Sequence, residues 1–349
     1  MYRILIIILL YALTYNFSLS QDTIIGEQKV KILPFPVFGY SPETRTYVGA
    51  VTLFTINLYN DSITRTSNTK FEINYSQNKQ VIIESNWNYF FREEKWFTKG
   101  QIHYSKYPDF YYGIGSDTPL SNKLLYNSNR FLFEAFLLKK FQNNIFTGLN
   151  FKYFDYRNVS YADSLIAYPE LVNGSDFGVG YSILIDKRNN LLTPSKGSFV
   201  YLNTTYNLAK ENFWEVTLDL RYYHSLKNRL TFAFRLINDF NLGNPPFYDY
   251  AFLGGDKFVR GYTYGRYRDN NLSSVQIEIR YPIIWRFGIA SFGGLSNLYS
   301  DFRFGNTRYN YGGGIRFLVD KKEKTNLRLD YAVGDGGNSG FYVAFGESF

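Results

Sequence analysis

The chain has 349 residues, 20% of them aromatic, and a formal net charge of +8 from 38 basic and 30 acidic side chains. Because Lys and Arg are scattered along the whole chain, the sequence argues against nucleic acid as a partner. The absence of Cys excludes a disulfide framework and Cys–His metal centres. We expect no cofactor and no metal.

The first twenty residues have the pattern of a targeting segment. Arg3 is followed by an apolar stretch from 4 to 13, and Ser18-Leu19-Ser20 offers small residues where a signal peptidase cuts. We therefore predict a cleaved signal peptide at 1–20 and a short periplasmic segment at 21–30. An uncleaved membrane anchor is the alternative, but the apolar stretch is shorter than the ~20 residues that a spanning helix needs.

From residue 31 onward, apolar and polar side chains alternate in segments of about ten residues, with turn residues between them. In one such segment Val275, Ile277 and Ile279 alternate with Gln276 and Glu278. Period two puts the two sets on opposite faces of a strand. The sequence contains sixteen such candidate strands: 32–40, 46–58, 69–77, 79–90, 96–107, 130–141, 145–158, 175–186, 198–207, 213–225, 229–240, 273–284, 286–296, 309–319, 325–334 and 340–349.

The connections between these candidate strands differ in length on the two sides. Four long connections fall on one side, at 108–129, 159–174, 241–272 and 297–308, whereas most on the other side are short. Long outer loops and short periplasmic turns are typical of bacterial outer-membrane barrels. Lipid offers no partner to an unpaired backbone N–H, so such a sheet must close on itself.

We therefore predict an all-β protein, a transmembrane antiparallel β-barrel at 31–349 in the bacterial outer membrane. Its surroundings would be outer-membrane lipids and lipopolysaccharide. Since the count of strands is even, both ends of the barrel would return to the periplasmic side.

Three motifs resemble one family. They are FLGGDKFVRGY at 252–262, DKRNNLLTPSKGS at 186–198 and Glu-x-Arg-Tyr-Pro at 278–282. They are similar to the loop motif, the turn and the following strand of the bacterial surface antigen superfamily. That superfamily includes the BamA assembly factors, the TamA proteins and the two-partner-secretion transporters.

The resemblance implies a sixteen-stranded barrel whose loop at 241–272 folds back into the lumen. It carries over the loop motif onto Val259, Arg260, Gly261 and Tyr262. In the family the arginine is held by acidic residues of the inner wall, and a guanidinium fork matches a carboxylate well. Glu278, on the polar face of the next strand together with Arg280, is the partner that we expect for Arg260. The alternative is that Arg260 is a solvated loop charge.

The sequence departs from the family pattern in two places. Gly294 stands where the family usually has an Asp, so a second acidic partner for Arg260 would be missing or come from elsewhere. The segment between Gln21 and Lys31 has no room for a POTRA domain, because even minimal domains need ~40 residues. We therefore expect a relative without POTRA domains, which argues against client capture by such domains.

The last residues resemble the signal by which barrels are recognised for insertion. Phe341, Val343, Phe345 and Phe349 are the apolar positions of this signal, and Glu347 departs from its pattern. The resemblance implies the barrel-assembly machinery as a partner during insertion.

Three functions remain open. The first is a component of outer-membrane biogenesis or protein transport, acting with periplasmic or outer-membrane protein partners. The second is a structural barrel that anchors or plugs a periplasm-associated complex. The third is an outer-membrane hydrolase, which the sequence favours least. The two His residues, His103 and His224, lack the spacing of a catalytic triad, so we expect no enzyme.

Overall fold

The computed structural model describes residues 21–25, 28–41, 45–59, 61, 63–161, 168–227, 229–256, 258–300, 303–321 and 324–349. The predicted signal peptide at 1–20 lies outside them. In these ranges no helix is long and apolar enough to cross a membrane.

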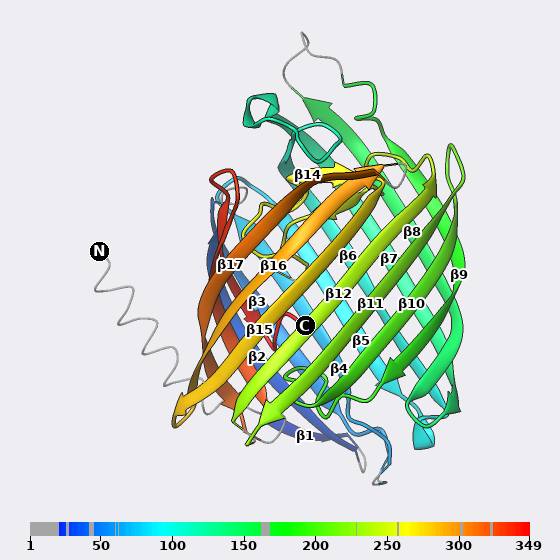
Figure 1. Ribbon diagram of the computed structural model, residues 1–349. Helices are drawn as coiled ribbons and strands as arrows, with labels where there is room; N and C mark the ends of the chain where they lie inside the picture. Colours follow the sequence, from blue (N-terminus) through cyan, green and yellow to red (C-terminus); the bar gives the residue numbers. More distant parts are fainter. Residues whose placement is uncertain are drawn as a thin grey trace.

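The described residues form one antiparallel sheet that curves into a barrel (Figure 1). Eleven strands from β2 to β12 and five from β15 to β19 make up its wall, sixteen in all. Each strand pairs with the next, β12 pairs with β15, and β19 lies beside β2 in the sheet order. The wall strands are β2 (Gln28–Ser41), β3 (Arg45–Ile56), β4 (Ser67–Ser76), β5 (Val81–Phe90), β6 (Trp96–Tyr111), β7 (Leu124–Gln142), β8 (Ile145–Tyr161), β9 (Gly174–Asp186), β10 (Gly197–Leu208), β11 (Phe213–Leu226), β12 (Leu230–Gly243), β15 (Asn271–Ile284), β16 (Phe287–Ser300), β17 (Arg303–Asp320), β18 (Thr325–Gly334) and β19 (Ser339–Phe345).

Alternation decides which side chains face the lumen. On β15, Val275, Ile277 and Ile279 are exposed on the outer face, whereas Gln276 and Glu278 are buried inside the barrel. An apolar outer face and a polar inner face are what a lipid-embedded barrel requires. The predicted sixteen-stranded barrel is thereby confirmed.

Several predicted boundaries are wrong; β7, for example, begins at Leu124 and not at residue 130. The predicted loop at 297–308 is mostly strand, since β16 and β17 continue to a pairing of Ser300 with Arg303. A polar side chain of this segment forms a hydrogen bond between the two paired strands and not within a turn. The Asn297 side chain donates to the carbonyl of Gly305 at 2.7 Å. The predicted last strand at 340–349 ends at Phe345, because Gly346 has a φ of +77° and turns the chain inward.

The amino-terminal segment that we assigned to 21–30 contains a further strand, β1 (Gln21–Ile25), which pairs with the first residues of β2. Those residues of β2 also pair with β3 on their other side. β1 therefore lies along the edge of β2 that faces away from β3.

The loop between β12 and β15 folds into the lumen, as the family resemblance implied. Residues 244–270, called the plug below, include the short strands β13 (Ala251–Leu253) and β14 (Tyr267–Asp269), which pair with each other. Figure 1 shows the plug in yellow inside the end of the barrel that carries the long loops. This end is called the long-loop end, and the opposite one the short-turn end.

An apolar cluster fills part of the barrel at the short-turn end. Phe90 stacks on Phe97 with ring centroids 4.4 Å apart, and Phe97 also contacts Phe146 at 5.6 Å. Phe136, Leu138, Leu184 and Phe199 complete the buried cluster. Because these side chains are almost fully buried, they hold six neighbouring strands together at one end of the lumen.

We expect Phe97→Ala to lower the free energy of unfolding by about 3–5 kcal/mol, since it removes a buried ring and leaves a cavity. Urea unfolding of the barrel in detergent micelles, followed by tryptophan fluorescence, measures this change. The matched control is Phe141→Ala, because Phe141 is 72% exposed. Equal effects of the two substitutions would contradict the assignment of the cluster to the barrel interior.

Candidate functional site

The loop motif lies at the tip of the plug and is packed against the inner wall. Val259 is fully buried among Leu253, Leu272 and Leu298. Gly261 has a φ of +103°, and a Cβ there would lie 2.8 Å from the carbonyl carbon of Val333 on β18. Only glycine fits this conformation and this close approach.

Hydrogen bonds hold the same tip to the last strands. The backbone N–H of Gly261 donates to the hydroxyl of Tyr342 on β19 at 2.9 Å. The hydroxyl of Tyr262 donates to the carboxylate of Asp335 at 2.8 Å. The tip of the plug is therefore bonded to β19 and to the turn that precedes it.

The structure brings Arg260 and Glu278 together. Arg260 Nη2 lies 2.5 Å from Glu278 Oε2, and both side chains are 1% exposed or less. The guanidinium carbon also lies 3.4 Å above the ring centroid of Phe292. Arg260 is thus a buried charge with a carboxylate at its edge and an aromatic ring at its face, not a solvated loop charge.

A second acid holds Arg260, and sequence reasoning missed it. Asp330 Oδ2 on β18 lies 2.5 Å from Arg260 Nη1. Gly314 stands directly opposite Asp330 in the sheet, and a Cβ at Gly314 would lie 2.0 Å from Asp330 Oδ1. The glycine therefore leaves room for the carboxylate.

Gly294, where the family usually has an Asp, has no room for one. A Cβ at this position would lie 2.9 Å from Asn310 Oδ1 and 3.0 Å from Gln276 Cγ. The missing acidic partner comes from Asp330 instead. The run of glycines at 312–314 was the available signal, because glycines in a strand interior mark a close approach of other groups.

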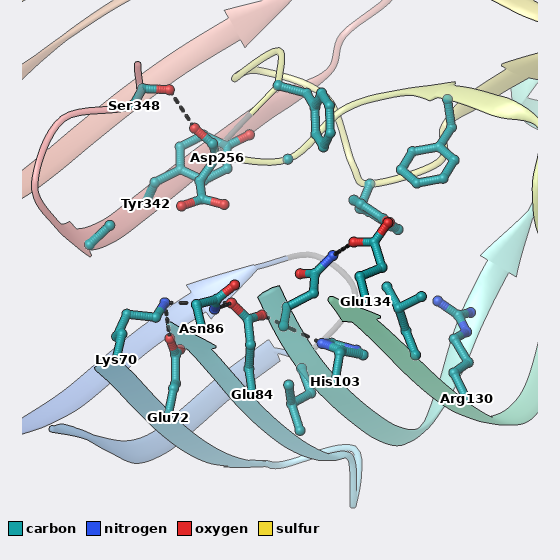
Figure 2. Close-up of a pocket in the computed structure, with 18 of the residues that line it drawn as sticks. Lys70, Glu72, Glu84, Asn86, His103, Arg130, Glu134, Asp256, Tyr342 and Ser348 are labelled. Carbon is teal, nitrogen blue, oxygen red and sulfur yellow. Dashed lines mark hydrogen bonds and ion pairs between the residues drawn. The ribbon is translucent and has the colours of Figure 1, made fainter. Parts of the chain in front are cut away.

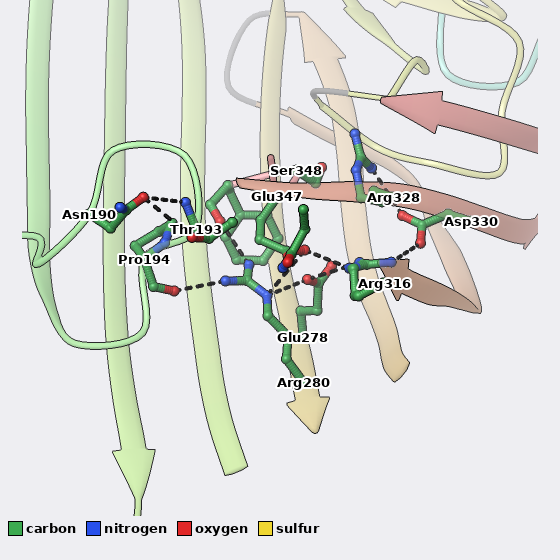
Figure 3. A network of polar contacts seen from close by, with 12 residues as sticks. Asn190, Thr193, Pro194, Glu278, Arg280, Arg316, Arg328, Asp330, Glu347 and Ser348 are labelled. Atoms are coloured by element: carbon green, nitrogen blue, oxygen red, sulfur yellow. Dashed lines mark hydrogen bonds and ion pairs between the residues drawn. The ribbon is translucent and has the colours of Figure 1, made fainter. Parts of the chain in front are cut away.

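Further charges extend this contact into a network of arginines and carboxylates (Figure 3). Arg316 bonds Asp330 at 2.5 Å and Glu347 at 2.7 Å. Arg280 Nε lies 2.6 Å from Glu278 Oε1, and Arg328 lies 3.0 Å from Asp330. We call this set the arginine network; its members are Arg260, Glu278, Arg280, Arg316, Arg328, Asp330 and Glu347.

The segment 346–349 and the turn at 187–196 meet at the network, as Figure 3 shows. The guanidinium of Arg280 donates to the carbonyl of Pro194 at 2.9 Å and to that of Phe349 at 2.8 Å. The N–H of Glu347 donates to the carbonyl of Leu192 at 2.8 Å. The turn motif, which we recognised only by resemblance, thus supports the network from the short-turn end.

The apolar positions of the predicted insertion signal divide between two places. Phe341, Val343 and Phe345 lie on β19. Phe349 lies inside the barrel, buried against Tyr223 and Ala233. The prediction that Phe349 lies on the last strand is wrong, because the chain leaves the wall at Gly346. A role of these four residues in insertion stays a prediction.

A second contact, on another part of the wall, holds the beginning of the plug. Lys152 Nζ on β8 lies 2.5 Å from the carboxylate of Asp249 and 2.9 Å from that of Glu215 on β11. Beside it, the ring of Tyr248 stacks on that of Tyr156 with centroids 5.2 Å apart. Nothing in the sequence pattern indicated this contact, since alternation does not place a loop.

The loop at 112–123 covers the plug at the long-loop end. The N–H of Gly115 donates to the carbonyl of Arg268 at 2.6 Å, and the Arg266 guanidinium donates to the hydroxyl of Thr118 at 3.0 Å. Arg308 on β17 donates to the carboxylate of Asp117 at 3.1 Å. This loop therefore ties the plug to the rim.

Below the plug lies a cavity of about 910 Å³, lined by both apolar and charged side chains. Figure 2 shows Lys70, Glu72, Glu84 and His103 facing it from β4, β5 and β6. Glu84 Oε2 lies 3.5 Å from Nδ1 of His103. His224 is exposed on the outer face of β11, so the structure does not bring the two His residues together.

The same cavity reaches the junction between β2 and β19, called the seam below. Pro36 and Val37 of β2 and Val343 and Phe345 of β19 are among the residues that line it. Across the seam, the ring centroids of Phe35 and Phe345 lie 4.4 Å apart. The cavity thus extends from the polar inner wall to the first and last strands.

Comparisons with known proteins agree with this geometry. The family model of the Omp85 superfamily domain matches residues 40–349. The barrel is similar to BamA from Haemophilus ducreyi lacking POTRA domains 1–3, with a TM-score of 0.57 and 12% identity over 91% of this chain and 70% of that one. It is also similar to CdiB from Acinetobacter baumannii, with a TM-score of 0.55 and 12% identity over 93% of this chain and 60% of that one. No sequence among the curated proteins matches. At this identity the structures share the fold, and the resemblance drawn from the sequence is confirmed.

We expect Arg260→Ala to loosen the plug while the barrel still forms. The substitution leaves Glu278 and Asp330 without their shared partner, but Arg280, Arg316 and Arg328 still neutralise them in part. We therefore expect a cost of roughly 2–4 kcal/mol for the closed plug. Limited proteolysis of the plug and single-channel conductance in planar bilayers measure the loosening.

The matched control for this substitution is Arg157→Ala, which removes an exposed arginine paired with Asp155 on the outer end of β8. It should leave both measurements unchanged. Wild-type proteolysis and conductance in Arg260→Ala would show that the arginine does not hold the plug.

Proposed function

The chain belongs to the Omp85 superfamily, and we propose that it acts in outer-membrane biogenesis or protein transport through an opening at the seam of its barrel. Membership indicates the outer membrane as its location. Lipids and lipopolysaccharide would surround the wall. Periplasmic or outer-membrane proteins would be its partners. Its client would be another polypeptide, which enters from the periplasmic side as an extended segment.

The seam supports this proposal because its last strand is short. β19 has seven residues, whereas its neighbours β18 and β2 have 10 and 14. Below Phe345 the chain leaves the wall for the lumen, and only the short strand β1 pairs with this edge of β2 there. Each backbone hydrogen bond between strands contributes only about 0.5–1.5 kcal/mol net. A short ladder is therefore the least costly one to open.

The first strand weakens the seam further. Pro34 and Pro36 lie within β2 and have no N–H to donate to either neighbour. Prolines in a sheet are confined to edges and bulges, and β2 becomes an edge strand when the seam opens. The sequence of β2 thus suits a strand that alternates between a paired and a free edge.

The cavity supports the proposal from inside the barrel. It is lined by charged side chains of the inner wall and also by residues of both seam strands. A polypeptide segment admitted at the seam would meet the charged side chains of the inner wall on one side and lipid on the other. An opening of this kind serves insertion into the membrane as well as passage through it.

A second candidate is a structural barrel that anchors or plugs a periplasm-associated complex. The observation that favours it is the double attachment of the plug, to Arg260 on one part of the wall and to Lys152 on another. A lumen closed in this way needs no opening to act as a scaffold. An outer-membrane hydrolase has little support, because His103 and His224 lie on different faces of the wall.

Locking the seam separates the two candidates. In this Cys-free chain, Val37→Cys with Val343→Cys places thiols two residues along each strand from the contacting rings of Phe35 and Phe345. We expect the oxidised variant to reproduce the outer-membrane proteome and secretion defects of a gene deletion, and reduction to reverse them.

The matched control is Leu329→Cys with Val343→Cys, which joins directly paired residues of β18 and β19 and leaves the seam free. It should behave like the wild type under both conditions. If the seam-locked protein supports normal secretion and a normal outer-membrane proteome, the proposal is wrong and the structural barrel is favoured.

A further inference from the structure

Three carboxylates from three elements surround one buried lysine at the beginning of the plug. Lys152 Nζ lies 2.5 Å from Asp249 Oδ1 in the plug, 2.9 Å from Glu215 Oε2 on β11 and 3.7 Å from Asp176 Oδ2 on β9. The side chains of Lys152, Asp176 and Asp249 are all at least nine-tenths buried. One ammonium therefore faces three acids at the edge of the cavity below the plug.

The surroundings of this group leave much of the negative charge uncompensated. Neither carboxylate oxygen of Asp176 has a hydrogen-bond partner, and Oδ2 of Asp249 has none either. Two strands pair with β9 beside Asp176: Lys152 on β8 and Asn207 on β10 both stand opposite Gly178. An acid that is buried without a donor is more stable as the neutral carboxyl.

The arrangement does not suit a metal ion. The lysine ammonium already occupies the centre of the carboxylates, at hydrogen-bond distance from two of them. Within the described ranges, no group of three His, Asp or Glu side chains is placed to hold a metal. A proton is the small cation that this cluster can still take up.

We propose that Lys152, Asp176, Glu215 and Asp249 form a proton-operated latch, which closes the first arm of the plug (244–250) onto the wall when a carboxyl of the cluster is protonated and releases it when the proton is lost. The arm is the part of the plug that moves. The arginine network holds the other arm independently, because Arg260 contacts none of these residues.

The direction of the pH effect follows from the burial of Asp249. Burial raises the pKa of the Asp249 carboxyl above its usual value, and the nearby ammonium of Lys152 opposes this only in part. In the released arm, the carboxyl would return to its ordinary pKa of about 3.9. The closed arm thus binds the proton more tightly, so closure is favoured at low pH and is lost as the pH rises through the raised pKa.

The groups that face Asp249 act in both directions, and burial decides the sign. Glu215 on β11 repels its ionised form, whereas Lys152 on β8 and the adjacent carboxyl of Asp176 on β9 lower its pKa without offsetting the effect of burial. From β12, the neutral amide of Asn241 donates to the backbone carbonyl of Asp249 at 3.0 Å, so it adds no charge. Within the arm, the phenol of Tyr248 is the neighbouring titratable group.

The latch can be tested by the accessibility of one introduced thiol. Ala251→Cys puts a small side chain at a buried position directly after the arm, and Asn244→Cys puts one at an exposed position of the arm. The ratio of their labelling rates with a polar maleimide cancels the intrinsic pH dependence of the thiol reaction. We expect this ratio to rise at least tenfold between about pH 5 and about pH 8, because the closed arm loses its proton as the pH rises.

Three variants then assign the effect to the cluster. Asp249→Asn or Asp176→Asn mimics the protonated carboxyl and should keep the ratio low at both pH values. Lys152→Met should raise the ratio at about pH 8 and let it fall at about pH 5, because protonation replaces the missing ammonium. Asp155→Asn, on the outer face of the same strand, should follow the wild type.

Two results would overturn the latch. One is a labelling ratio in the wild type that does not change with pH. The other is a pH profile of Asp249→Asn and Asp176→Asn that matches the wild type, which would assign the pH effect to other groups. Both carboxamide variants keep the volume of the side chain, so the test stands even where Lys152→Met does not fold.

Discussion

The position of the plug in this barrel depends on the contacts of one buried group, the guanidinium of Arg260. It lies between Glu278 and Asp330 and on the ring of Phe292. A charge in such a place is stable only while its partners stay fixed, because an unpaired buried charge costs several kcal/mol. These contacts therefore require that the pairing register of the wall strands and the position of the plug are both fixed.

On three successive strands, the pairing register places the residues that surround Arg260 next to one another. Glu278 on β15 stands opposite Phe292 on β16, which stands opposite Gly312 on β17. The glycine leaves space for the ring, just as Gly314 leaves space for Asp330. From there the arginine network continues to Glu347 and, through Arg280, to the turn at 187–196. The plug, the last strand and this turn are thus coupled through one set of charges.

The sequence predicted the parts of this arrangement that depend on strand periodicity. Alternation placed Glu278 on the inner face, and the family motif supplied Arg260, so their contact followed from the two together. Asp330 could not be found in this way, since its nearness to Arg260 depends on how the sheet curves and on space left by a glycine. The contact between Lys152 and Asp249 was missed because a loop has no periodicity. Asn297 misled the prediction of a loop, because its side chain bonds the strand ladder, and Gly346 takes Phe349 out of the last strand.

The tip of the plug belongs to the rigid wall, whereas the seam is the weakest strand pairing of that wall. Hydrogen exchange of the protein in nanodiscs, followed by mass spectrometry, measures both properties at once. We expect amides at 258–262 to exchange as slowly as those of β15 and β18, and β19 to exchange fastest among the strands of the wall. Fast exchange at 258–262, like that of the exposed turn at 209–212, or protection of β19 equal to that of β18, would contradict this expectation.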